Sequence, residues 1–135
     1  MTPETALVAA GGLHLGFQAV VSVVVYPALA TTRPQDWDVV HAAHARRITW
    51  LVAPLYLAVA AACLWVLLDG PHTVWSLVSL TGHAVAAVTT ATVAAPAHGR
   101  LGRTGPSTAL LTRLLAADRV RLAATAVAFG AALVV

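Results

Sequence analysis

The chain has 135 residues, of which 59% are hydrophobic and only 10% are charged, and its formal net charge is +3. This composition is too apolar for a soluble domain of that length and is typical of a protein that crosses a membrane several times. The positive charge comes from arginines that flank apolar runs, which argues against a nucleic-acid partner, and a single cysteine, Cys63, excludes an intrachain disulfide or a cysteine metal cage.

Four apolar segments are predicted to span the membrane as helices, at about residues 5–30, 36–69, 72–98 and 108–135. A spanning helix needs about 20 predominantly apolar residues, and each segment reaches that length. The short polar sequence Asp69-Gly70-Pro71 predicts a tight turn, so the second and third helices form a hairpin. We therefore expect a single all-α domain, an integral membrane antiparallel four-helix bundle.

The basic residues predict the orientation of these helices. The chain has no lysine, and all eight arginines fall at the same end of the expected bundle: Arg33, Arg46, Arg47, Arg100, Arg103, Arg113, Arg119 and Arg121. Arginine-rich connections stay in the cytoplasm, which predicts that both termini lie outside it. The usage of alanine, valine and arginine without lysine indicates a high-GC bacterium and hence a multi-pass protein of the plasma (inner) membrane. The first apolar run is too long for a signal peptide and is expected to be retained.

Tryptophans are expected to mark the two membrane surfaces, because their amphipathic rings favour the headgroup level. Trp37 and Trp50 are placed at the arginine end by this argument, and Trp65 and Trp75 at the other end. Lipid is therefore the first expected partner.

The first segment carries a stripe of polar residues at a spacing of four, namely His14, Gln18, Ser22 and Tyr26. Polar groups at membrane depth must face the bundle interior or a wet cavity, so these residues, with His83, are predicted to line a substrate cavity. Simple hydrogen bonding between helices is the alternative. His14 and His83 lie at similar depth and either hold a haem or bond to each other, and nothing else in the sequence marks a haem pocket.

Gly12 and Gly16 bracket His14 in a GxxxG arrangement. This spacing allows another helix backbone to approach closely, and it favours a homo-oligomer.

A second group of polar residues gathers at the arginine end, on three different segments: His41, His44, His98 and Asp118. Imidazole and carboxylate suit iron, copper or zinc, so these four residues are candidate ligands for one transition metal. They are alternatively proton-transfer groups. Asp118 also lies one turn from Arg121, and an ion pair between the two is expected because unpaired charges at that depth are costly.

These residues together resemble those of the anthrone-oxygenase-like family (DUF1772). The resemblance rests on short motifs spread in order over nearly the whole chain: Gln18, Tyr26-Pro27, His41-x-x-His44, Pro54, Pro96-x-His98-x-x-Leu101, and Asp118 followed by Arg121. It implies a small four-helix membrane protein, and it implies an oxygenase that converts polycyclic aromatic anthrones to anthraquinones without a well-defined cofactor. Family members more often carry asparagine at the position of Asp118.

The sequence thus favours an enzyme, namely a membrane oxidoreductase or monooxygenase that acts on an apolar, aromatic small molecule arriving from the bilayer. His41, His44, His98, Asp118 and Arg121 are the predicted catalytic residues. The alternative is a non-catalytic transporter-like or accessory membrane protein, in which the polar residues serve helix packing or an ion path.

Overall fold

The computed structural model describes all 135 residues, and it is helical throughout, with no strand. The expectation of an all-α protein is confirmed. The elements in chain order are α1 (Pro3–Val20), η1 (Val21–Val25), α2 (Tyr26–Ala30), η2 (Pro34–Asp36), α3 (Trp37–Asp69), α4 (Val74–Thr89), η3 (Thr90–Ala94), α5 (Ala95–Thr104) and α6 (Thr108–Ala132).

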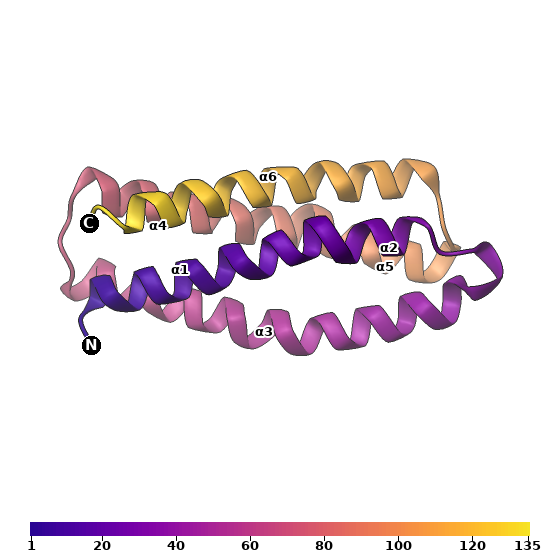
Figure 1. Ribbon diagram of the computed structural model, residues 1–135, viewed down its shortest axis with the longest axis horizontal. Helices are drawn as coiled ribbons and strands as arrows, with labels where there is room; N and C mark the ends of the chain where they lie inside the picture. The colour runs from indigo at the N-terminus through magenta and orange to yellow at the C-terminus, as the bar shows by residue number, and fades with distance from the viewer.

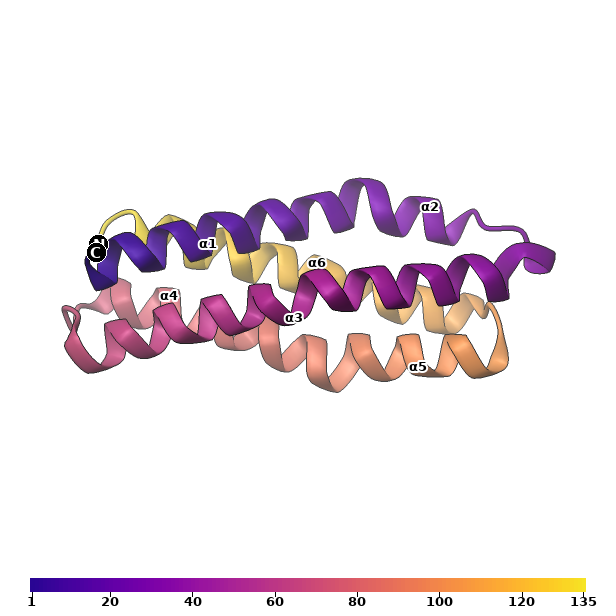
Figure 2. The same cartoon turned by 90° about the horizontal axis from the view of Figure 1, so that it is seen from below.

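Four helical rods lie side by side along the long axis of the molecule (Figures 1 and 2). The first rod joins α1, η1 and α2, the second joins η2 and α3, the third joins α4, η3 and α5, and the fourth is α6. Both termini lie at the same end of the molecule as the connection between α3 and α4 (Figure 1). Two connections lie at the opposite end: the one between α2 and η2, which carries Arg33, and the one between α5 and α6, which follows Arg103.

Three of the rods are long and apolar enough to cross a membrane: Pro3–Ala30, Pro34–Asp69 and Val74–Thr104. The fourth rod, α6, does not qualify by the same measure, since Arg113, Asp118, Arg119 and Arg121 lie in it. Large apolar side chains cover the outside of the molecule, including Val23, Leu57 and Trp50, which are 72–77% exposed. An apolar exterior around an interior that also holds polar side chains is the pattern expected of a protein surrounded by lipid.

The tightest helix contact is between α4 and α6, and it depends on Gly82. A Cβ atom at Gly82 would lie 2.7 Å from the carbonyl oxygen of Ala124 and 2.8 Å from Cβ of Ala128, so no larger residue fits without movement. The GxxxG pair behaves differently from the expectation. A Cβ atom at Gly12 would lie 3.3 Å from the ring of Phe129, and a Cβ atom at Gly16 would have nothing within 4 Å. Close packing inside the chain is thus at Gly82, and self-association through Gly16 stays a prediction.

The third rod extends further than the sequence predicted. It continues through Pro96 to Thr104, where Gly105 ends it with a φ of 79°, a conformation that glycine adopts without steric cost. The basic residues Arg100 and Arg103 therefore belong to a helix, not to a loop.

Two π-helical turns interrupt the first and third rods, and each ends two residues before a proline. The N–H of Tyr26 bonds to the carbonyl of Val21, and the N–H of Ala95 bonds to that of Thr90; Pro27 and Pro96 follow. Proline has no N–H to donate and its ring presses on the carbonyl four residues earlier, so a widened turn relieves the clash. The extra residue also rotates the side chains that follow by about 100° around the helix axis. Both turns border the polar site described next.

Candidate functional site

Nine polar or charged side chains are buried in the interior: His14, Gln18, His41, Ser76, Ser79, His83, Asp118, Arg121 and Thr125. Such groups are costly at membrane depth unless they are paired, so their partners show what holds them there. Most of these side chains form contacts between rods.

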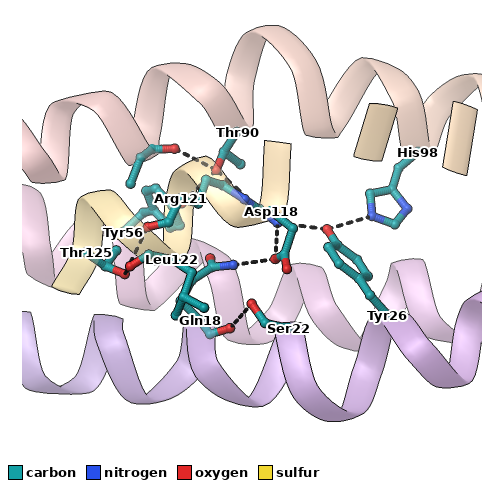
Figure 3. Close-up of polar contacts among 11 residues, drawn as sticks. Gln18, Ser22, Tyr26, Tyr56, Thr90, His98, Asp118, Arg121, Leu122 and Thr125 are labelled. Carbon is teal, nitrogen blue, oxygen red and sulfur yellow. Dashed lines mark hydrogen bonds and ion pairs between the residues drawn. The ribbon is translucent and has the colours of Figure 1, made fainter. Parts of the chain in front are cut away.

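Arg121 is the centre of the largest network, although only 6% of it is exposed. Its Nη2 donates hydrogen bonds to the hydroxyl of Tyr26 at 2.9 Å and to Oδ1 of Asp118 at 3.1 Å (Figure 3). Its Nη1 donates to Oγ1 of Thr90 at 3.4 Å. The guanidinium group thereby connects α6 with the ends of both π turns, whereas its Nε is buried without a partner.

Asp118 neutralises this arginine from one helical turn away, as predicted, and the ion pair is confirmed. Its Oδ1 also accepts a hydrogen bond of 2.6 Å from Nε2 of Gln18 on α1 (Figure 3). The carboxylate thus has two donors, one of them charged, which is the arrangement that makes a buried ion pair tolerable.

The three histidines expected at the arginine end do come together. The ring centroid of His98, on α5, lies 5.6 Å from that of His41 and 5.4 Å from that of His44, both on α3. Nδ1 of His98 is 3.4 Å from Nε2 of His41, and Nε2 of His98 is 3.4 Å from the hydroxyl of Tyr26. His98 therefore contacts His41 through Nδ1 and Tyr26 through Nε2.

Asp118 does not join these histidines, contrary to the predicted set of four ligands. The position of its carboxylate is fixed by Gln18 and Arg121, and the Tyr26 side chain lies between it and His98 (Figure 3). No group of three or more His, Cys, Asp or Glu side chains is placed to hold one metal ion. The residues present do not fit a metal centre in this arrangement.

A cavity of about 300 Å³ borders the network between α3 and the third rod. Its apolar wall includes Phe17, Val21, Ile48, Val52 and Ala94, and its polar wall is formed by Tyr26, His44, Thr90, His98 and Arg121. Exposed residues at its rim, among them Thr49, Ala53 and Ala95, show that it opens sideways between the rods. In a membrane this opening would face the acyl chains.

Of the residues predicted to line the substrate cavity, only Tyr26 does so. Gln18 is turned towards Asp118, and Ser22 donates to the carbonyl of Gln18 within its own rod at 2.9 Å. His14 and His83 bond to each other, with 3.1 Å between their Nδ1 atoms, which is the mutual contact considered as one alternative above. The stripe on the first rod therefore joins helices through His14, Gln18 and Tyr26.

Three residues that contribute to this polar site were not predicted from the sequence. Trp37, expected at the membrane surface, is 1% exposed, donates from Nε1 to the carbonyl of Leu101 at 3.1 Å and stacks on His41. The hydroxyl of Tyr56 lies 2.7 Å from Oγ1 of Thr90, which itself donates to the carbonyl of Ala86. One signal for Thr90 was present in the sequence: it lies six residues before Pro96, as Val21 lies six residues before Pro27.

Comparison with known proteins adds no relative. No protein-family profile, no curated protein and no solved structure matches the chain.

Proposed function

We propose that the chain is an integral membrane protein of a bacterial plasma membrane and that its four rods form an antiparallel four-helix bundle, with α6 as the fourth span. The buried pairing of Asp118 with Arg121 supports this assignment, because it removes the main obstacle to placing α6 in a membrane. The arginine end faces the cytoplasm and both termini face the outside, since arginine-rich connections are retained on the cytoplasmic side.

Cysteine labelling tests this orientation. In a Cys63→Ala background, Thr2→Cys should react with a membrane-impermeant maleimide added to intact cells, and Thr104→Cys should react only after the membrane is opened. The two positions lie at opposite ends of the rods. Labelling of Thr104→Cys alone in intact cells would reverse the proposed orientation.

For the activity, we propose a membrane oxidoreductase of the anthrone-oxygenase type that acts on an apolar aromatic molecule. The observation that supports it is the cavity, which has an apolar wall and ends in a cluster of a buried arginine, a tyrosine and a histidine. Such cavities bind flat apolar molecules and orient them through a few convergent polar groups.

Three polar groups of the cavity have a role in this proposal. The Arg121 guanidinium and the Tyr26 hydroxyl stabilise negative charge on an oxygen of the substrate, because fixed donors are strong where water is excluded. His98 accepts the proton that the substrate releases as it ionises, and it lies 3.4 Å from that hydroxyl. Dioxygen then oxidises the electron-rich ring: one of its oxygen atoms becomes the new carbonyl, and the other leaves as water.

The sideways opening gives the substrate a route from the bilayer, and this route can be blocked. Ala53 lies at the rim of the cavity. Ala60 lies seven residues further along the same face of α3, and it borders only the neighbouring apolar groove, which Ala53 also lines. Wild-type protein in lipid nanodiscs should convert anthrone to anthraquinone in air, as followed by absorbance and mass spectrometry. Ala53→Trp should abolish most of this conversion, and Ala60→Trp should retain it.

Two outcomes would contradict the proposed activity. One is the absence of anthraquinone above the level of empty nanodiscs. The other is an equal loss in both tryptophan variants, which would show that the cavity mouth is not the entry route. The first outcome would favour a non-catalytic membrane protein instead, in which buried contacts such as that between His14 and His83 serve helix packing.

A further inference from the structure

We propose that His98 and His41 form a proton relay that connects the internal cavity with a separate polar pocket at the arginine end of the molecule. The relay rests on the cavity site proposed above and gives that site an exit for its proton. Its geometry does not depend on which substrate occupies the cavity.

The first observation is that His98 uses its two ring nitrogens on opposite sides. Nε2 faces the Tyr26 hydroxyl in the cavity wall, and Nδ1 faces Nε2 of His41, at 3.4 Å in each case. A neutral imidazole has one donor nitrogen and one acceptor nitrogen, so it can take up a proton on one side and release another on the other side. His98 has the geometry for such a transfer.

The second observation is a pocket of about 460 Å³ on the far side of the two rings. Asp38, His41, Gly99, Gly102 and Arg103 contribute to its wall. Its lining, unlike that of the cavity, is mostly polar or glycine, and Asp38, Gly99, Gly102 and Arg103 are exposed. His98 and Ala45 line both spaces, so the imidazole of His98 lies in the partition between them.

The third observation is the fixed position of His41. Its ring stacks on Trp37 with centroids 5.1 Å apart, and Trp37 is itself fixed by a hydrogen bond to the carbonyl of Leu101. Nδ1 of His41 therefore lies against Gly102, where a Cβ atom would be 3.5 Å from it. The absence of a side chain at Gly102 leaves this nitrogen open to the polar pocket.

The transfer conserves atoms and charge at every step. A proton from the Tyr26 hydroxyl, or from a molecule in the cavity that is hydrogen-bonded to this hydroxyl, binds to Nε2 of His98. The proton on Nδ1 of His98 then moves to Nε2 of His41. The proton on Nδ1 of His41 then passes to water in the pocket. The charged groups facing this path are Arg121 on the cavity side, and Asp38 and Arg103 on the pocket side, with His44 beside both rings.

Nuclear magnetic resonance tests the relay without any substrate. The protein is labelled with ¹⁵N-histidine, placed in lipid nanodiscs, and the exchange of the His98 ring N–H with water is measured by saturation transfer from the water signal. His41→Phe should slow this exchange by about tenfold or more, because it keeps a flat ring against Trp37 but removes the nitrogen that accepts the proton.

Two glycine variants provide a matched pair in case His41→Phe fails to fold. Gly102→Val covers Nδ1 of His41 and should slow the exchange of His98 as well. Gly99→Val lies one turn away on α5 in the same pocket, where its Cβ meets only Arg103 at 3.5 Å, and should leave the exchange at the wild-type rate.

Unchanged exchange in the folded His41→Phe protein, or equal slowing by both valine variants, would overturn the relay. Either result would leave the anthrone assay unaffected. Conversely, if the protein does not oxidise anthrone but His41→Phe slows the exchange of the His98 ring N–H, the proposed activity is rejected and the relay is retained.

Discussion

Replacing Arg121 with methionine should lower the free energy of unfolding by about 3–5 kcal/mol, the range found when one partner of a buried ion pair is removed. The substitution leaves the Asp118 carboxylate, which is 4% exposed, with the Gln18 amide as its only donor. It also removes the hydrogen bonds to Tyr26 and Thr90 that connect α6 to the first and third rods.

Unfolding in mixed micelles of increasing sodium dodecyl sulfate, followed by circular dichroism, measures this loss. Arg119→Met is the matched control, because Arg119 is on the same helix and exposed, and it should stay within about 0.5 kcal/mol of the wild type. The double variant Asp118→Asn with Arg121→Met should recover much of the loss, since no charge is then left unpaired. A double variant no more stable than Arg121→Met would show that the charge pair is not the cause.

Asp118→Asn alone should fold and lose less stability than Arg121→Met. The amide oxygen of asparagine can still accept from both Gln18 and Arg121, the two donors that Asp118 has now.

Replacing His98 with glutamine should lower the rate of anthrone oxidation by about 10²–10⁴-fold, the range typical of a lost general base. Glutamine can still form a hydrogen bond to the Tyr26 hydroxyl, but it cannot take up a proton. The rate is measured in nanodiscs under air, with the melting temperature recorded on the same preparation to show that the fold is retained.

His72→Gln is the control for this experiment. His72 is exposed at the opposite end of the molecule, where Nε2 contacts the carbonyl of Leu67, and its replacement should leave the rate unchanged. An unchanged rate in His98→Gln as well would show that His98 does not accept the proton, even if anthrone is a substrate.

Much of the helical framework is predictable from the sequence because it depends on local rules. Apolar length defines the helices, and the turn at Asp69-Gly70-Pro71 together with the cap at Thr73 separates α3 from α4. The Asp118–Arg121 pair is local too, since residues three apart meet on one helix face. The gathering of His41, His44 and His98 is also predictable, because similar depth on neighbouring helices limits how far apart they can lie.

The direction in which each side chain points around its helix was decided only by the tertiary structure. Sequence gives depth along a rod but not its rotation, and the two π turns change that rotation midway along the first and third rods. Tyr26 and Thr90 consequently meet Arg121, and Asp118 is held by Gln18 on the side away from the histidines. The burial of Trp37 likewise depends on the length of α5, because Trp37 bonds to the carbonyl of Leu101 in that helix. Pro96 would be expected to end the third rod, but the π turn η3 relieves the proline clash and the helix continues to Thr104.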